Sequence, residues 1–479
     1  MVLLLRLGEI TIKGKKTRKK FEKLLLANIE DAFTSGNIQY RIRKEWGRIF
    51  VYTNAEEKAV EVLKQIFGIK SISIAYETKF EEFDDLVLKA KEYFVDKVKG
   101  KRFAVRARRI GQHSFTSLDV EKALGAALLS FGAGVDLRNP EVTAYVEIRG
   151  HRVYFYTNSI KAYGGLPIGS EGKVIALVSG GFDSPVAAWY ALRRGAAVHY
   201  LLCKIGGDTQ EIAVLHVLKT LADKWSYGYR PKLYVVDFNE ILKEMKNKCN
   251  ASLLNLILKR YMYRAAEVIA AREGAEAIVT GESLGQASSQ TLRNLYVSSL
   301  AARLQILRPL IGFDKDEIVS IAREIGTHDA SARVKEYCSV FSEHPKTHAS
   351  MEEVEAEEAK LDPALLSKAL ENAKVYDLRS VKIEEKLEGL EVDRVPDDAV
   401  IITFEAKEWG QQYPPSSIRM SFDQLLENVG KLDPSSTYVL VCDEGALSLE
   451  AAYILRKLGI NAYSFKGGIR RLRRLASAT

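Results

Sequence analysis

The hydrophobic and polar positions of the first 75 residues change period several times, which indicates short strands separated by helices. Residues 2–7 are almost all apolar over a length typical of a strand, whereas residues 18–33 repeat apolar positions at helical spacing. The pattern predicts strands over 2–7, 38–44, 48–53 and 71–76 and helices over 18–33 and 56–66. This β-α-β-β-α-β order predicts an α+β domain over residues 1–75.

A second pattern of mixed period covers residues 76–168. It predicts helices over 83–98 and 119–131 and strands over 102–109, 141–149 and 152–158. Residues 164–169 are rich in glycine and contain Pro167, so we expect a turn-rich linker there. The segment therefore forms a second domain, of the α/β class.

From residue 169 onward, short apolar runs alternate with helical stretches. The runs are residues 174–178, 198–203, 233–238 and 277–281. Such alternation predicts a parallel sheet with both faces covered, in a domain over residues 169–345. Residues 346–374 are acidic and helical in pattern, so we expect a linker, and residues 375–479 alternate again and form a last α/β domain.

One glycine-containing loop stands directly after the first of these apolar runs. It reads Ser179-Gly180-Gly181-Phe182-Asp183-Ser184 and precedes a helix-like segment that starts at Pro185. Glycines let the backbone approach phosphate oxygens closely, and the first N–H groups of a helix point at an anion. The loop lacks the lysine and the spacing of a Walker A motif. It therefore predicts a polyphosphate pocket of a different kind from that of kinases and motor proteins.

The charge of the chain is unevenly placed. The formal charge is +8, yet residues 1–170 hold 30 Lys and Arg against 20 Asp and Glu, a surplus of ten. The first third is therefore where a polyanion such as nucleic acid would be drawn. No apolar stretch is long enough for a membrane span, and the short run at residues 2–7 contains Arg6, unlike a signal peptide. We expect a cytoplasmic protein.

The four cysteines are scattered and form no CxxC pair. Four such thiols in a chain of 479 residues do not suggest a secreted disulfide framework, so we expect a reducing compartment. The most informative is Cys442, which follows a strand-like run and precedes a helix-like segment. Backbone N–H groups at such a position stabilise a thiolate.

Four separated motifs resemble a single enzyme family. The loop at residues 179–184 resembles the SGGxDS signature of PP-loop pyrophosphatases, which split ATP into AMP and pyrophosphate and adenylate a carbonyl oxygen. The other three motifs are LRLGEI followed by KGK (5–15), TGESLGQ followed by SSQTL (280–292), and RPLIGFDK (308–315). In this order they resemble the tRNA 4-thiouridine synthetase family over essentially the whole chain.

This resemblance implies a domain organisation and a reaction. The domains would be a ferredoxin-like domain (1–75), a THUMP RNA-binding domain (76–168), an α/β PP-loop ATP pyrophosphatase domain (169–345), a helical linker (346–374) and a rhodanese-like persulfide carrier (375–479). The enzyme would adenylate uridine 8 of tRNA and replace its carbon-4 oxygen with sulfur, and would also supply sulfur for the thiamine thiazole. The implied partners are tRNA, a cysteine desulfurase and the sulfur-carrier protein of thiazole synthesis. A homodimer is left open.

The resemblance also implies an ATP site that works with Mg²⁺. Asp183 would hold magnesium or orient the phosphates, and Lys315 would neutralise charge that develops on phosphate. The expected ATP-binding residues are Val178, Ser179, Gly180, Gly181, Phe182, Asp183, Ser184, Cys203, Lys204, Arg260, Gly281, Glu282, Ser283 and Gln286.

The RNA-binding residues are expected among the basic clusters of the first two domains. Alternate positions of one strand place several cations on one face, and phosphate contacts of this kind position RNA without reading its sequence. The expected RNA-binding residues are Lys13, Lys15, Lys16, Arg102, Arg106, Arg108 and Arg109.

Sulfur delivery is assigned to two cysteines. Cys442 lies in a segment that resembles the rhodanese loop CxxGxRS, with a KGG segment at residues 466–468, so Cys442 would carry the persulfide. Cys338 matches the second cysteine of the family. It would attack the persulfide-linked intermediate and leave a Cys338–Cys442 disulfide that a reductant resets. Direct attack by the persulfide and prior release of sulfide both stay open.

The rhodanese-like loop departs from the usual pattern. Leu447 occupies the arginine position, and Asp443 and Glu444 add negative charge beside the thiol. We therefore expect loading from a protein persulfide, such as that of a cysteine desulfurase, in place of thiosulfate.

Other interpretations are weaker on these residues. Cys338, His344 and His348 lack a fourth metal ligand nearby, and an iron–sulfur cluster needs more cysteines, so neither a tightly bound metal nor a cluster is expected. The alternative functions are a PP-loop thiolase acting on another tRNA position, a sulfur-relay protein that serves mainly thiazole synthesis, and an RNA-binding module whose ATP site is idle.

Overall fold

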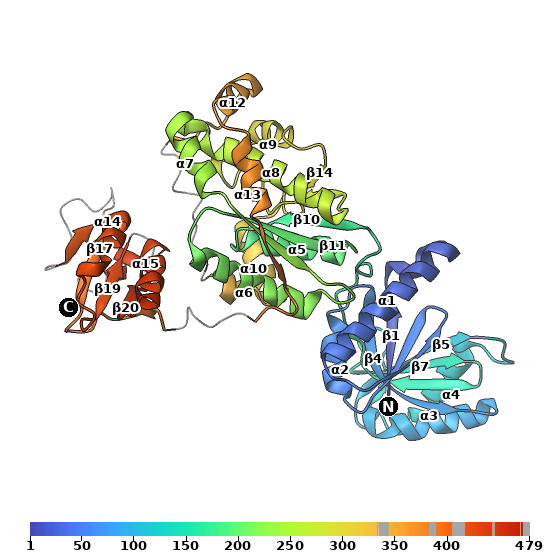
Figure 1. Ribbon diagram of the computed structural model, residues 1–479. Helices are drawn as coiled ribbons and strands as arrows, with labels where there is room; N and C mark the ends of the chain where they lie inside the picture. The colour runs from blue at the N-terminus through green and yellow to red at the C-terminus, as the bar shows by residue number, and fades with distance from the viewer. Residues whose placement is uncertain are drawn as a thin grey trace. The chain divides into compact units, whose positions relative to one another are not determined.

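The computed structural model divides the chain into two compact units (Figure 1). The first holds residues 1–171 with the short segments 193–195 and 227–229, and the second holds the rest. The structure describes residues 1–332, 334, 344–382, 389–404, 417–442, 446–469 and 471–472. No helix among these residues is long and apolar enough to cross a membrane.

The first unit is built on one sheet of nine strands. The strand order is β2-β3-β1-β4-β8-β7-β5-β6, with β9 also paired to β4. The strands are β1 (Val2–Leu7), β2 (Arg41–Glu45), β3 (Arg48–Tyr52), β4 (Ile69–Lys79), β5 (Arg102–Ile110), β6 (Gly134–Val135), β7 (Val142–Arg149), β8 (Arg152–Tyr156) and β9 (Ile160–Lys161). The helices are η1 (Glu9–Ile12), α1 (Lys15–Ser35), α2 (Glu56–Lys64), α3 (Phe83–Val98) and α4 (Ser117–Leu128).

Strand β4 joins the two halves of this sheet. Its first half pairs with β1 and its second half with β8, so the expected boundary between residues 75 and 76 falls inside one strand. Ile72 packs into the cluster under α1 and α2, and the ring of Tyr76 stacks on Tyr93 of α3. Because side chains alternate along a strand, these even positions show that all four α-helices lie on the same face of the sheet.

The opposite face of the sheet buries charged and aromatic side chains. Glu147 of β7 accepts a hydrogen bond from Arg149 of the same strand, at 2.9 Å, and forms an ion pair with Arg48 of β3, also at 2.9 Å. Strands β3 and β7 are not neighbours, so the sheet must curl for these groups to meet. The ring of Phe50 likewise stacks on Tyr154 of β8 at 4.7 Å between centroids.

This network holds Glu147 in its charged form. Burial alone would raise the pKa of Glu147, but the guanidinium groups of Arg48 and Arg149 outweigh burial and keep the pKa below its usual value. The carboxylate is 1% exposed. Removing one partner of such a buried group leaves an uncompensated charge, which is far more costly than losing a surface ion pair.

The second unit contains a six-stranded sheet with the order β14-β13-β10-β11-β12-β15. Its strands are β10 (Lys173–Leu177), β11 (Ala197–Lys204), β12 (Lys232–Asp237), β13 (Ala277–Val279), β14 (Gln305–Leu307) and β15 (Lys374–Asp377). The helices are α5 (Asp183–Arg193), α6 (Asp208–Trp225), α7 (Asn239–Lys248), η2 (Ala251–Leu253), α8 (Leu254–Glu273), η3 (Ser288–Gln290), α9 (Leu292–Ser299), α10 (Lys315–Ile325) and α11 (His328–Ser331). The first five strands are parallel, as the alternation of apolar runs and helices predicts.

The acidic segment that looks like a linker belongs to this same sheet domain. Helices α12 (Met351–Glu358) and α13 (Ala364–Glu371) bury Val354 and Leu370 in the core cluster that also contains much of α8. Glu358 pairs with Arg260 at 2.8 Å, and β15 adds to β12 as an antiparallel strand. One acidic residue of the segment, Glu358, thus pairs with the α8 arginines Arg260 and Arg264, and the domain extends to about residue 377.

A separate five-stranded sheet with the order β16-β20-β19-β17-β18 forms the last part of the chain. Its strands are β16 (Glu391–Val392), β17 (Val400–Phe404), β18 (Ile418–Met420), β19 (Tyr438–Val441) and β20 (Ala462–Phe465), and its helices are α14 (Phe422–Glu427), η5 (Val429–Lys431) and α15 (Ala446–Lys457). All its strand pairs are parallel. Leu440 and Cys442 pack with α15, whereas Val439 and Val441 point to the other face.

Replacing Glu147 by Ala should loosen the curled sheet of the first unit. Because Arg48 and Arg149 would lose their buried partner, the free energy of opening should fall by about 3–5 kcal/mol. Native-state hydrogen exchange of the full chain, read by mass spectrometry on peptides that cover β3 and β7, measures this change. The control is Glu92→Ala on the exposed face of α3, with an expected change within about 0.5 kcal/mol. Equal exchange in the two variants would contradict the role given to Glu147.

Candidate active site

The glycine loop connects β10 to α5 at the carboxyl end of the six-stranded sheet. Strand β10 lies between β11 and β13, and the loop runs from Val178 to Phe182 before α5 begins at Asp183. Gly180 has a φ of +85°, a conformation that only glycine adopts without strain. The N–H of Ser179 donates to Ser184 Oγ at 3.3 Å, which closes the loop over the start of the helix.

A second segment comes against this loop from the end of β13. A Cβ atom added to Gly281 would lie 2.7 Å from the carbonyl carbon of Asp183 and 2.8 Å from the nitrogen of Ser184. No real side chain tolerates such distances to backbone atoms. Gly281 is therefore needed for the close approach of the two segments that together form the site.

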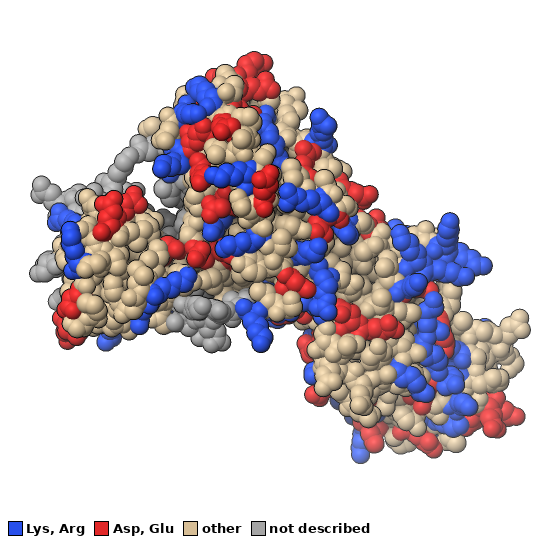
Figure 2. Space-filling model, viewed as in Figure 1, with Lys and Arg blue, Asp and Glu red and all other residues tan. Residues whose placement is uncertain are grey.

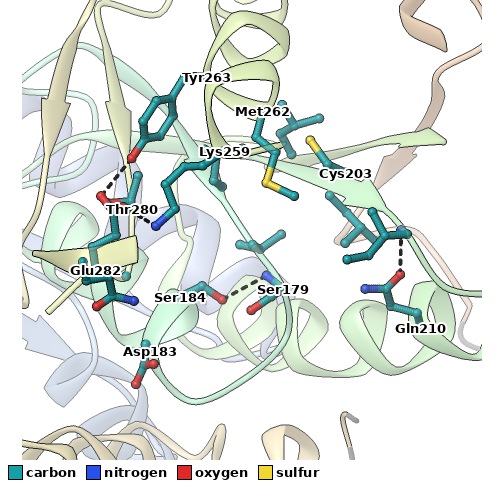
Figure 3. A pocket seen from close by; sticks show the side chains of 17 residues that line it. Ser179, Asp183, Ser184, Cys203, Gln210, Lys259, Met262, Tyr263, Thr280 and Glu282 are labelled. Carbon is teal, nitrogen blue, oxygen red and sulfur yellow. Dashed lines mark hydrogen bonds and ion pairs between the residues drawn. The ribbon is translucent and has the colours of Figure 1, made fainter. Parts of the chain in front are cut away.

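Between these segments lies a pocket of about 200 Å³ (Figure 3). One wall is apolar and comes from strand ends, the start of the loop and α8, with Leu177, Val178, Leu201, Leu202, Ile205 and Met262. The other residues that line it, most of them polar, are Ser179, Asp183, Ser184, Cys203, Gln210, Lys259, Tyr263, Thr280, Gly281, Glu282 and Gln290. An apolar slot beside a loop of N–H and hydroxyl donors suits a ligand with a flat ring at one end and phosphates at the other.

Glu282 organises the polar side of the pocket. Its carboxylate forms ion pairs with Lys259 at 2.6 Å and Arg308 at 2.7 Å. It also accepts hydrogen bonds from the hydroxyls of Tyr263 and Thr280, at 2.8 and 2.9 Å. Figure 3 shows Lys259, Tyr263 and Thr280 turned toward Glu282. Its role is thus to hold the lysine and the tyrosine in fixed positions at the wall of the pocket.

The ionisation of Glu282 follows from this arrangement. Burial alone would raise its pKa, but the charges of Lys259 and Arg308 and the hydrogen bonds lower the pKa to about 2. A carboxylate with a depressed pKa stabilises the fold above its unfolded pKa of about 4 and loses that contribution as the pH falls toward 2. At neutral pH the group is therefore a fixed anion and not a proton carrier.

Asp183 and Lys315 meet at the edge of the pocket. Lys315 Nζ lies 2.7 Å from Asp183 Oδ1, and Gln286 Nε2 donates to Asp183 Oδ2 at 3.2 Å. Lys315 is the first residue of α10, whose amino end is fixed by a capping box between Asp314 and Glu317. Three motifs that are far apart in the sequence thus place one carboxylate, one ammonium and one amide beside the glycine loop.

Several expected ATP-binding residues occupy other positions. Lys204 points into a cluster of carboxylates, with Asp237 at 3.4 Å and Asp208 and Glu211 at 3.6 Å. Arg260 is buried in its pair with Glu358. Neither side chain lines the pocket, and the same holds for Gly180, Gly181, Phe182, Ser283 and Gln286. Ser283 donates to the carbonyl of Phe313, and the ring of Phe182 contacts that of His328.

The pocket also contains residues that the sequence analysis missed. Lys259 and Tyr263 are four residues apart on α8, so they share one face of the helix, and Lys259 lies next to Arg260, which was expected in its place. Gln290 lines the pocket from the segment that was singled out as a motif, and its side-chain oxygen accepts from the N–H of Ser283. No local signal separates Lys259 from Arg260, because buried positions surround α8 and the place of Arg260 is set by its pair with the distant Glu358.

A second site of interest lies at the end of β19. Cys442 is 5% exposed, and its sulfur lies 3.4 Å from the N–H nitrogen of Ser448 and 3.3 Å from its hydroxyl oxygen. The thiol therefore faces the amino end of α15, as the sequence predicts. Leu447, at the position of the usual arginine, is largely exposed. Cys338, Asp443 and Glu444 lie outside the described residues.

Five of the seven basic residues that were expected to bind RNA form two groups. Lys13, Lys15 and Lys16 stand at the start of α1, where Figure 2 shows a dense group of basic side chains. Arg106 and Arg108 are exposed on one face of β5. The remaining two are Arg102, which is exposed but pairs with Asp136 at 3.2 Å, and Arg109, which lies on the opposite face and contacts His113.

No group of three or more histidine, cysteine, aspartate or glutamate side chains in the described part of the chain is arranged to hold a metal ion. In the pocket, Glu282 is saturated by Lys259 and Arg308, which leaves Asp183 as the carboxylate that could share a cation with a phosphate ligand. Such sharing is how Mg²⁺ is usually bound beside nucleotides.

Comparison with protein families divides the chain into four matched parts. Residues 2–73 match the ThiI ferredoxin-like domain, residues 80–158 the THUMP domain, residues 169–362 the family described as thiamine biosynthesis protein (ThiI), and residues 390–474 the rhodanese-like domain. The ThiI match extends into the acidic segment, as expected if α12 belongs to the six-stranded sheet domain.

Full-length relatives and a solved structure agree with these matches. The tRNA sulfurtransferase of Pyrobaculum aerophilum is 44% identical over 475 residues, which is 97% of this chain and 96% of the relative. That of Shigella boydii is 35% identical, over 95% of this chain and 97% of the relative. A crystal structure of a 4-thiouridine synthetase–RNA complex with bound ATP superposes with a TM-score of 0.69 at 33% identity, and covers 78% of this chain and 98% of that one.

These matches extend over all four domains and over nearly the full length of the relatives. The ferredoxin-like, THUMP, PP-loop and rhodanese-like parts expected from the sequence are therefore confirmed as the architecture of the chain. The protein belongs to the tRNA sulfurtransferase family.

Proposed function

We propose that this protein uses ATP to convert uridine 8 of tRNA to 4-thiouridine, with Cys442 as the carrier of the incoming sulfur. The observation that carries the proposal is the pocket at the glycine loop, where an apolar wall, the loop donors and the Asp183–Lys315 pair come together. The solved complex of a similar 4-thiouridine synthetase holds both RNA and ATP, which supports the same pairing of ligands here.

The first chemical step is adenylation. The carbon-4 oxygen of the uridine attacks the α-phosphorus of ATP, the new oxygen–phosphorus bond forms, and the bond to the β-phosphate oxygen breaks to release pyrophosphate. Ser179, Ser184 and the N–H groups of the loop hold the phosphates, and Lys315 offsets the charge that grows on them. Mg²⁺, where bound, supplies further charge neutralisation, and Asp183 is the residue that would hold it.

The second step replaces oxygen by sulfur. The terminal sulfur of a persulfide on Cys442 attacks carbon 4, and AMP leaves with the former carbonyl oxygen. The base is now joined to Cys442 through a sulfur–sulfur bond. Cys338 attacks the Cys442 sulfur, and this bond breaks with its electron pair on the sulfur of the base, so that 4-thiouridine is released. A Cys338–Cys442 disulfide remains for an external thiol reductant to open. The sulfur donor is a cysteine desulfurase persulfide, since Leu447 removes the usual anion-binding arginine.

The first unit binds the tRNA. Exposed cations at the start of α1 and along one face of β5 contact phosphates, and the ferredoxin-like and THUMP parts share one sheet within one compact unit. Recognition of this kind reads the shape of RNA more than its base edges. A cytoplasmic location, where tRNA and a reducing environment coexist, belongs to the same proposal.

A second function, the supply of sulfur for thiamine thiazole, is favoured by the match of residues 169–362 to a family described as thiamine biosynthesis protein. Only the carrier domain is needed for that role. Ending the chain at residue 382 would retain β15 and remove the carrier while leaving the six-stranded sheet complete. In cells with this shortened protein, tRNA 4-thiouridine and thiamine-independent growth should both be lost. Asp183→Asn keeps the carrier, so it should lower tRNA thiolation and leave thiamine-independent growth intact, and nucleoside analysis of these cells separates the two functions.

Asp183→Asn should abolish thiolation while tRNA binding stays within about twofold of the wild type. Loss of one preorganised charged group at a phosphoryl-transfer site lowers the rate of the chemical step by a factor of about 10²–10³. The measurement is release of AMP and pyrophosphate together with thiolated nucleoside in the tRNA. Asp316→Asn, an exposed carboxylate one residue beyond Lys315, is the matched control and should keep full activity. Normal AMP release by Asp183→Asn would remove the residue from the adenylation step.

Cys442→Ser should prevent persulfide loading. Incubation of the full chain with a cysteine desulfurase and cysteine should add the mass of one sulfur atom to the wild type and none to this variant, because the hydroxyl cannot form a persulfide. Cys249→Ser, at a partly buried thiol of the six-stranded sheet domain, serves as control and should load normally. Loading that persists in Cys442→Ser would assign the carrier to another thiol.

Arg106→Gln with Arg108→Gln should weaken tRNA binding and reduce its salt dependence. Two lost phosphate contacts lower the slope of log K against log salt by about 1.4–1.8. Titrations of tRNA binding at several salt concentrations measure this slope. Arg109→Gln is the control, because it removes a cation from the other face of the same strand and should leave the slope nearly unchanged. Equal effects at both faces would place the RNA elsewhere.

A further inference from the structure

Three buried side chains form a continuous row behind the carrier thiol. Ser448 Oγ in the first turn of α15 lies 3.3 Å from Cys442 Sγ and 2.9 Å from Ser464 Oγ on β20. Ser448 and Ser464 are fully buried and Cys442 is 5% exposed. The thiol is therefore linked through one serine to a second serine that lies on the neighbouring strand.

The fold fixes this row from two directions. Ser464 is paired with Leu440 across β20 and β19, so it stands on the same face of the sheet as Cys442, the face that α15 covers. The N–H of Ser448 also points at the sulfur, at 3.4 Å, which sets the position of its hydroxyl. The row is packed against apolar side chains that include Leu440, Ala451 and Leu455, so each buried hydroxyl needs a hydrogen-bond partner.

We propose that Ser464 is a positioning residue for the sulfur chemistry of Cys442. It donates its proton to Ser448 Oγ, which leaves the hydroxyl of Ser448 free to donate to the sulfur. In such a chain, the hydrogen bond from Ser448 to the sulfur is stronger than the same bond would be without Ser464, because each hydrogen bond polarises the next. The inference rests on the proposed role of Cys442 as carrier and adds a residue that no motif of the sequence analysis singled out.

The row acts on the step that loads sulfur. The Cys442 thiolate attacks the outer sulfur of the donor persulfide, a new sulfur–sulfur bond forms to Cys442, and the bond in the donor breaks with its electron pair on the donor thiolate. Ser448 supplies two donors, its N–H and its hydroxyl. They stabilise the attacking thiolate before this step and hold the sulfur in a fixed position at the end of β19. Without Ser464, the Ser448 hydroxyl loses the partner that orients it.

The test measures the alkylation rate of Cys442 in the full-length protein at a single neutral pH, by mass spectrometry of the peptide that contains it. Ser448→Ala should slow alkylation about tenfold and Ser464→Ala about threefold. The double variant should be no slower than Ser448→Ala, because the two serines act in series. Ser464→Thr keeps the hydroxyl and should restore the wild-type rate. Ser436→Ala, at a partly exposed serine of the same domain whose hydroxyl donates to Asp433, is the control and should have no effect.

Two further readouts separate positioning from packing. The ultraviolet thiolate band, taken as wild type minus Cys442→Ser, should weaken in Ser464→Ala even when thermal unfolding is unchanged. An unaltered alkylation rate and band in Ser464→Ala, or strictly multiplicative effects in the double variant, would overturn the proposal. Persulfide loading is measured on the same samples, and its failure in the wild type would overturn the carrier role of Cys442. The alkylation rates would still show whether Ser464 acts on Cys442 through Ser448.

Discussion

The candidate active site depends on the close approach of two backbone segments at the carboxyl ends of β10 and β13. Gly281 lies so near the backbone of Asp183 and Ser184 that any side chain would separate them. This contact places the glycine loop, the Glu282 network and the Asp183–Lys315 pair around one small pocket. Parallel strands that end side by side make such convergence possible, since each contributes a loop to the same edge.

Fixed charge is used in the same way in the two units. Glu282 is a buried anion that holds Lys259 and Arg308 at the wall of the pocket, so its position matters more than its proton. Glu147 does for the curled sheet of the first unit what Glu282 does for the pocket, because it links Arg48 and Arg149 on separate strands. In both places a single carboxylate between two cations fixes elements that are distant in the sequence.

The rhodanese-like domain places hydrogen-bonding groups around one sulfur atom. Cys442 lies on a strand end against α15, with the N–H and hydroxyl of Ser448 directed at it. The usual arginine is replaced by Leu447, and Ser448 places two neutral hydrogen-bonding groups against the sulfur. The loss of that arginine is one of the features on which the proposed loading from a protein persulfide rests.

The sequence by itself determined the local structure and the chemistry of the loops. Alternating apolar runs predicted the parallel strands, and the glycine loop predicted a phosphate site, because both depend on residues adjacent in the chain. The tertiary structure decided which side chains meet. Helix rotation places Lys259 in the pocket and Arg260 against Glu358, and strand pairing places β4 in both halves of one sheet and the acidic segment in the core. Rotation and pairing are set by packing between distant segments, and no local period of the sequence encodes them.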